Sequence, residues 1–210
     1  MRSMSNMTIL ETGDATEVES ICEAADSIDG PVYCRVLRGS MPRLFDTPIV
    51  VGQMRELSLG ADVLIVTAGI TTEEAMRATK ALEASGVSVR HLHLNTIKPF
   101  NAEAMLDHIN SVKSGVITLE NHVTEGGIGS LVAEIMADNG VGKKLKRLGL
   151  NDTYAHGGSR AYLMRYYGLD ALALTQGVED LLGQKLDITE KDLTEARVDA
   201  VHSLAKAEGL

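Results

Sequence analysis

The sequence predicts an α/β fold: a mostly parallel sheet covered by helices on both faces, in three layers. Short apolar runs alternate with segments whose apolar residues recur every three or four positions, and this alternation extends over most of the chain. Glycine and proline separate the two kinds of segment. Alternation of strands with helices of this length is typical of parallel sheets, because each connection must cross back before the next strand begins.

One helix and one strand are predicted ahead of the main alternating block. Asp14 and Glu17 have the spacing of a capping box, and apolar residues then mark one face of a helix to Ile28. Residues 32–36 form an apolar run that predicts a strand. Residues 39–48 carry two prolines and are the best candidate for a linker, so the main block is expected to begin near residue 49.

The block from residue 49 supplies the strands of the predicted sheet and the helices between them. Thr71 and Glu74 have capping-box spacing at the start of one helix, and Asn101 can cap the next. The predicted strands cover residues 49–57, 63–66, 87–94, 116–119 and 145–150, and the predicted helices cover 71–85, 101–112 and 128–136.

Beyond Asp152 the chain is predicted to be helical. The first two helices end at Gly168 and Gly183, which suit the left-handed conformation at a helix end. The three predicted helices cover residues 159–167, 171–182 and 189–207.

Composition excludes several classes of protein. The 210 residues carry a net charge of −9 without blocks of one sign, which disfavours binding to nucleic acid or to an anionic membrane. Aromatic residues make up 3% and tryptophan is absent, so base-stacking platforms are not expected. No apolar run has the length of a membrane span, and the first residues lack the layout of a signal peptide. Cys22 and Cys34 lack metal or redox spacing, which favours a reducing, cytoplasmic compartment.

The stretch Gly115–Ser130 is the most conspicuous motif, because a buried strand leads directly into a glycine-rich helix start. Gly126, Gly127 and Gly129 could hold a phosphate at the helix N-terminus or allow a tight packing turn. The spacing lacks the third glycine of a dinucleotide fingerprint and the lysine of a P-loop. The packing turn is therefore the favoured interpretation.

Four histidines and one arginine are further candidates for a site. His91 and His93 point to the same side of one predicted strand and could share a metal, although spacing identifies no third ligand. His122 lies at the end of a strand beside acidic residues and could act as a general base or in an interface, and His156 lies in a polar loop. Both could equally be solvated. Arg38 follows a strand and precedes a glycine, which suits binding of a phosphate or carboxylate.

Six segments together resemble the transketolase family of thiamine-diphosphate enzymes, above all the C-terminal subunit of its split forms. They occur in the family's order from Gly13 to about Leu169. Deoxyxylulose-phosphate synthases and the β subunits of 2-oxoacid dehydrogenases share the same C-terminal domain. The segments are GDATEVES, DGPVYCRVLRG, ADVLIVTAGITTEEAMRA, GVSVRHLHLNTIKPF, ITLENHVTEGGIGSLVAEI and YAHGGSRAYLMRYYGL.

The resemblance implies a domain organisation. Residues 1–48 would be the tail of a pyrimidine-binding domain, residues 49–185 the transketolase C-terminal domain, and residues 186–210 a helical extension. The helix and strand of the first part would lack the rest of their sheet, which would leave an apolar stripe and a strand edge uncovered.

The resemblance also implies a function. The chain would be the C-terminal part of an enzyme that transfers a two-carbon ketol unit between sugar phosphates in the pentose phosphate pathway, with contacts in a homodimer. The completed enzyme would use thiamine diphosphate and Mg²⁺. The family's Gly-Asp-Gly motif is missing, because Ala15 follows Asp14. We therefore expect this chain alone to bind no cofactor and to be inactive. Catalysis would require an N-terminal subunit or domain.

Arg38 is the one site residue that the resemblance transfers to this sequence. It matches the family position that contacts the substrate's phosphate, whereas no catalytic, cofactor-binding or metal-binding residue is expected. The alternatives are a non-catalytic binding or assembly module with the same fold, or the equivalent domain of a deoxyxylulose-phosphate synthase or 2-oxoacid dehydrogenase β subunit.

Overall fold

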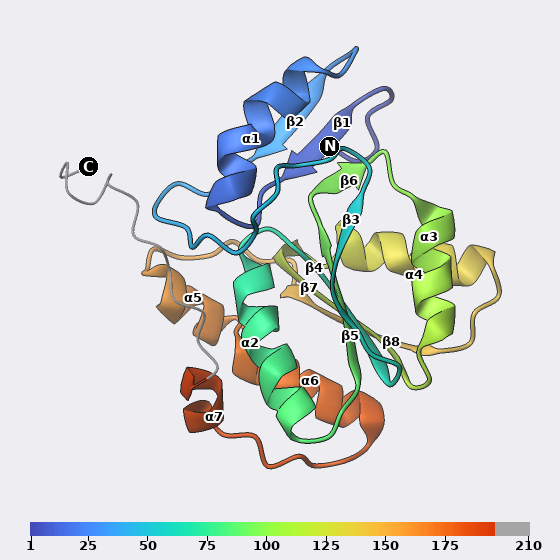
Figure 1. The fold of residues 1–210 in the computed structure, drawn as a ribbon, viewed down its shortest axis with the longest axis vertical. Coiled ribbons are helices and arrows are strands. Elements are labelled where there is room, and N and C mark those ends of the chain that lie inside the picture. The colour runs from blue at the N-terminus through green and yellow to red at the C-terminus, as the bar shows by residue number, and fades with distance from the viewer. Residues whose placement is uncertain (196–210) are drawn as a thin grey trace.

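The computed structural model describes residues 1–195, and its regular elements form two sheets with helices packed around them (Figure 1). The strands are β1 (Thr8–Glu11), β2 (Val32–Arg35), β3 (Met54–Leu59), β4 (Val63–Ala68), β5 (Val89–Leu94), β6 (Thr96–Lys98), β7 (Gly115–Val123) and β8 (Lys144–Leu150). The helices are α1 (Ala15–Asp26), α2 (Thr71–Ala84), α3 (Ala102–Ser111), α4 (Ile128–Asp138), α5 (Arg160–Tyr166), α6 (Ala171–Leu182) and α7 (Glu190–Glu195).

The larger sheet confirms the predicted three-layer architecture. Its five strands lie in the order β3-β5-β4-β7-β8, and all neighbours are parallel except the edge strand β3, which runs antiparallel to β5. All six residues of the central strand β4 are buried, as a strand covered on both faces requires. Helices α2 and α6 cover one face, and α3 and α4 cover the other (Figure 1).

A smaller sheet of three strands, in the order β2-β1-β6, was not predicted as such. Its strands β1 and β6 are only four and three residues long, so the sequence carries too little periodicity to reveal them. Strand β1 is parallel to β2 and antiparallel to β6, which follows β5 of the larger sheet. The smaller sheet therefore joins the N-terminal segment to the main block.

Helix α1 covers one face of the smaller sheet around a small core of Leu10, Ile21 and Ile49. The expected uncovered stripe on α1 is wrong, because Ile21 is buried and Ala25 and Ile28 pack against the same core, whereas Val18 is 36% exposed. The expected free edge is present within residues 1–195, since β2 pairs on one side only. No helix in this part of the chain is long and apolar enough to cross a membrane.

Two predictions about elements need correction, and part of a third lies outside the described residues. The edge strand predicted from residue 49 begins at Met54, because Ile49 turns inward to the core under α1. The capping box at Thr71 is wrong, since its hydroxyl donates to the carbonyls of Ala68 and Leu119, and Ile70 precedes the helix without a side-chain cap. The last predicted helix is seen as α7, and residues 196–207 of that prediction lie outside the described part.

Candidate functional site

Arg38 lies on the segment after β2 and lines a cavity of about 150 Å³. Its side chain is exposed, and within residues 1–195 no hydrogen bond or ion pair engages its guanidinium. A cation without an internal partner beside a cavity is available to an anionic ligand. The cavity is formed where several strands end, and its lining residues are Glu11, Thr12, Arg35, Val36, Leu37, Arg38, Gly69, Ile70 and Asn121.

Arg35 lines the same cavity, but internal contacts already engage it. Its guanidinium forms an ion pair with Glu11 and donates to Asn121 twice, to Oδ1 at 2.6 Å and to the backbone oxygen at 2.9 Å. These bonds connect the end of β2 to the end of β7. The sequence gives no sign of this difference between the two arginines, because both partners of Arg35 are distant in the chain. Arg38 is the one left free for a ligand.

The glycine loop before α4 holds a carboxylate of the protein itself. The Glu120 carboxylate accepts hydrogen bonds from the backbone N–H groups of Ile128 at 2.9 Å and Gly129 at 3.0 Å. A Cβ at Gly127 would lie 1.8 Å from Glu120 Oε2, so this glycine is required for the close approach. Burial raises the pKa of Glu120, while the two N–H groups oppose that rise. The favoured interpretation as a packing turn is confirmed, because the helix N-terminus is already filled.

His122 and His156 are both exposed and neither is oriented by a carboxylate. The Nδ1 atom of His122 lies 2.7 Å from the backbone oxygen of Val123. His156 lies among tyrosine rings and its Nδ1 is 3.1 Å from the hydroxyl of Tyr167. A general base needs a partner that fixes its tautomer and a substrate within reach. The Val123 oxygen fixes the tautomer of His122, since it can only accept from Nδ1–H, but within residues 1–195 no carboxylate orients either ring.

His91 and His93 point to the same side of β5, as predicted, but hydrogen bonds use their ring nitrogens. His91 Nε2 lies 3.0 Å from Thr67 Oγ1, whereas His93 Nδ1 lies 2.7 Å from Thr72 Oγ1 and its Nε2 lies 2.9 Å from Glu17 Oε2. Burial lowers the pKa of His91 to about 3, with a further contribution from the neighbouring His93. These bonds occupy the lone pairs that a shared metal would need.

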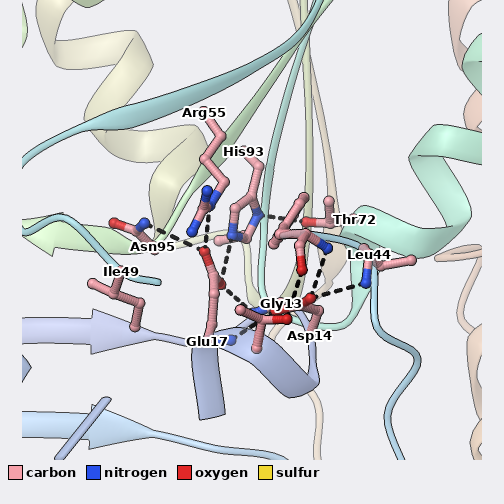
Figure 2. A network of polar contacts seen from close by, with 12 residues as sticks. Gly13, Asp14, Glu17, Leu44, Ile49, Arg55, Thr72, His93 and Asn95 are labelled. Atoms are coloured by element: carbon pink, nitrogen blue, oxygen red, sulfur yellow. Dashed lines mark hydrogen bonds and ion pairs between the residues drawn. The ribbon is translucent and has the colours of Figure 1, made fainter. Parts of the chain in front are cut away.

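Glu17 is the centre of a buried polar cluster that the sequence did not reveal, since its capping-box position explained it locally. Figure 2 shows its carboxylate between Gly13 on its own segment and Arg55, His93 and Asn95 of the larger block. The side chain is fully buried. Burial alone would raise the pKa of Glu17, but the bond and charge of His93, the Gly13 N–H and Arg55 together lower it to about 2.

The described residues do not fit thiamine diphosphate or its metal ion. The glycine-rich helix start that could bind a diphosphate is occupied by the Glu120 carboxylate. Within residues 1–195 no group of three or more histidine, cysteine, aspartate or glutamate side chains could hold a metal ion.

Comparisons with known proteins agree on one family. The sequence model described as "Transketolase, C-terminal domain" matches residues 52–174. A putative transketolase C-terminal section from Methanocaldococcus jannaschii is 32% identical over 182 residues, which are 85% of this chain and 56% of that relative. A 1-deoxy-D-xylulose-5-phosphate synthase from Geobacter sulfurreducens is 31% identical over 88% of this chain and 30% of its own length.

A solved structure shows the same fold. A split-gene transketolase, described as an inactive β4 tetramer, matches with a TM-score of 0.81 and 33% identity, over 88% of this chain and 61% of that one. The chain spans little more than half the length of the first curated relatives it matches, at 54% to 58%.

Proposed function

Because the chain belongs to the transketolase family, we propose that it is the C-terminal part of an enzyme that transfers a two-carbon ketol unit between sugar phosphates. The observation that carries this proposal is the match to a split-gene transketolase over 88% of the chain. The unengaged guanidinium of Arg38 beside a cavity gives the chain one group suited to a phosphate.

The domain boundaries belong to the proposal. Residues 1–48 would be the tail of a pyrimidine-binding domain, residues 49–185 the C-terminal domain and residues 186–210 an extension. The core of Leu10 and Ile21 under α1 supports a distinct N-terminal part, whereas β6 and Ile49 of the main block complete its sheet and core. A homodimer, the pentose phosphate pathway and a cytoplasmic location remain predictions from the sequence.

Thiamine diphosphate and Mg²⁺ would be bound by a partner subunit or domain. The Glu120 carboxylate in the glycine-rich helix start supports this arrangement, since it leaves this chain without a diphosphate cradle. The split-gene relative described as an inactive β4 tetramer is consistent with a subunit that needs a partner. Arg38 would hold the phosphate end of a sugar phosphate while chemistry takes place on the partner's cofactor.

Reconstitution tests this function. The purified chain with thiamine diphosphate, Mg²⁺, a ketose phosphate and an aldose phosphate is expected to give no new sugar phosphate. Addition of a polypeptide that carries the missing cofactor-binding motifs is expected to give one. Turnover by the chain alone would contradict the assignment of the cofactor to the partner, and no turnover with any complementing subunit would favour a non-catalytic assembly module.

A synthase function is the second candidate, because the Geobacter relative with that name matches 88% of the chain. The reconstituted assay, supplied with a 2-oxo acid such as pyruvate as a second donor, separates the two functions by product. A 1-deoxyketose phosphate would identify a synthase, whereas a ketose phosphate that gained a two-carbon ketol unit would identify a transketolase.

Replacing Arg38 by alanine is expected to raise KM for phosphorylated substrates about 10- to 100-fold, since each charge-assisted hydrogen bond contributes about 1.5–3 kcal/mol. KM for unphosphorylated substrates should change little. Arg43→Ala is the matched control, because Arg43 lies on the same segment but is paired with Glu19. An equal effect of Arg38→Ala on both substrate classes would make Arg38 a structural residue.

A further inference from the structure

The segment that carries Arg38 has no helix or strand of its own, so other contacts must fix it. It connects β2 to β3 through residues 36–53. Its returning half is bound to the start of α1, where the Asp14 carboxylate accepts from the N–H groups of Leu44 at 2.8 Å and Phe45 at 2.9 Å. The segment thus leaves the paired end of β2 at Arg35 and returns to the N-terminus of α1, so these two points together limit where Arg38 lies.

The N-terminus of α1 is in turn fixed on the five-stranded sheet by Glu17. Its carboxylate accepts from Arg55 Nε of β3 at 2.8 Å and is bonded to His93 Nε2 of β5 at 2.9 Å (Figure 2). The same residue accepts from the backbone of Gly13 at 2.8 Å. The Phe45 ring completes the connection, with the Arg55 guanidinium 4.6 Å from its centroid. One carboxylate thus links the start of α1 to two strands of the sheet.

Burial makes this link specific. A buried carboxylate is stable only when charged or polar partners surround it. The Glu17 carboxylate therefore cannot shift to another buried position without losing the partners that stabilise it. The other ring nitrogen of its partner His93, Nδ1, is bonded to Thr72 Oγ1. Thr72 Oγ1 lies 3.0 Å from Thr67 Oγ1, and the Thr67 hydroxyl is in turn bonded to His91. Because each of these buried groups is already bonded, none can move without leaving another unpaired.

We propose that Glu17 is a positioning residue for Arg38: by fixing the start of α1 on β3 and β5, it sets where the Arg38 segment presents its guanidinium. The inference rests on the proposed phosphate-binding function of Arg38. Glu17 lies in a different cluster from the cavity that Arg38 lines, so it acts through the segment and not on a ligand.

Amide measurements on the full chain test the proposal. Glu17→Gln replaces the anion with a neutral group of the same shape. Glu23→Gln is the matched control on the same helix, since Glu23 is exposed. In Glu17→Gln, the Leu44 and Phe45 amides are expected to exchange at least about tenfold faster than in the wild type. The NMR order parameter of the Arg38 amide should fall toward the flexible range, below about 0.6. In Glu23→Gln both quantities should match the wild type.

Two variants of His93 separate positioning from general loss of packing. His93→Gln keeps a donor for the carboxylate near the place of Nε2, whereas His93→Leu removes it. His93→Gln should retain most of the protection of the Leu44 and Phe45 amides, and His93→Leu should lose it. If Glu17→Gln fails to fold, as judged by circular dichroism, this pair decides the question. Equal exchange in both His93 variants, or unchanged Arg38 order in a folded Glu17→Gln, would overturn the proposal.

The reconstituted enzyme distinguishes this inference from the proposed function. If both hold, Glu17→Gln raises KM for phosphorylated substrates selectively, as Arg38→Ala does, but by a smaller factor. If Arg38→Ala leaves that KM unchanged, the phosphate-binding function fails, while the amide measurements still decide whether Glu17 fixes the segment.

Discussion

Lowering the pH from 6.5 to 4.5 is expected to destabilise the chain by about 2–3 kcal/mol through His91 alone. Burial lowers the pKa of His91 to about 3 in the folded state, whereas an unfolded histidine titrates near its usual value of 6.5. Between these values the unfolded chain binds one more proton than the folded chain, so stability rises with pH in that window. The contribution is complete above about pH 6.5 and lost as the pH falls toward 3.

Urea unfolding between pH 4.5 and 7.5 measures this effect in the wild type and in His91→Leu. In the variant, the free energy of unfolding should depend much less on pH in this range. The variant is also less stable at pH 7, because Thr67 and Thr79 lose a partner. His122→Gln is the control, since His122 is exposed and its removal should leave the slope unchanged. A slope that survives in His91→Leu would show that other groups account for the acid sensitivity.

Glu17 acts in a different pH window. Its folded pKa of about 2 lies below the ordinary value of 4.5, so its stabilising effect is present above about pH 4.5 and is lost as the pH falls toward 2. The two residues therefore affect successive ranges. Burial also lowers the pKa of His108, so this histidine contributes in the same direction as His91 above pH 4.5.

Local features of the fold could be predicted from the sequence because they depend on neighbouring residues. Helix α6 has the predicted limits, with Asp170 as its N-cap and Gly183 in the left-handed conformation at its end. The cap at Asn101 is also confirmed, since its side chain accepts from the N–H of Ala104. Such signals act over three or four residues, which is the reach of a sequence pattern.

Features that depend on distant residues could not be predicted. Strand β1 is recognisable only through its pairing with β2 and β6, the second of which is more than 80 residues away. The bond between Glu17 and His93 joins residues 76 positions apart, and each residue alone had a simple local explanation. Arg38 is predicted from its position after a strand and from the family resemblance, whereas only the structure shows that the nearby Arg35 is already paired.

The second large effect on stability is expected at the glycine loop before α4. Gly127→Ala is expected to destabilise the chain by about 2–4 kcal/mol, because the new Cβ would displace the Glu120 carboxylate and leave the N–H groups of Ile128 and Gly129 without their acceptor. The backbone at Gly127 is extended and acceptable to alanine, so the cost is the displaced carboxylate and not backbone strain.

A double-mutant cycle tests that cause. If Gly127→Ala acts by expelling the carboxylate, Glu120→Ala should cost about as much on its own, and the double variant should cost little more than either single one. Gly142→Ala is the control, since a Cβ there meets nothing within 4 Å and should change stability by less than about 0.5 kcal/mol. Urea unfolding of the four variants gives the energies. Additive losses would mean that Gly127 and Glu120 contribute independently, and that the helix start does not depend on the carboxylate it encloses.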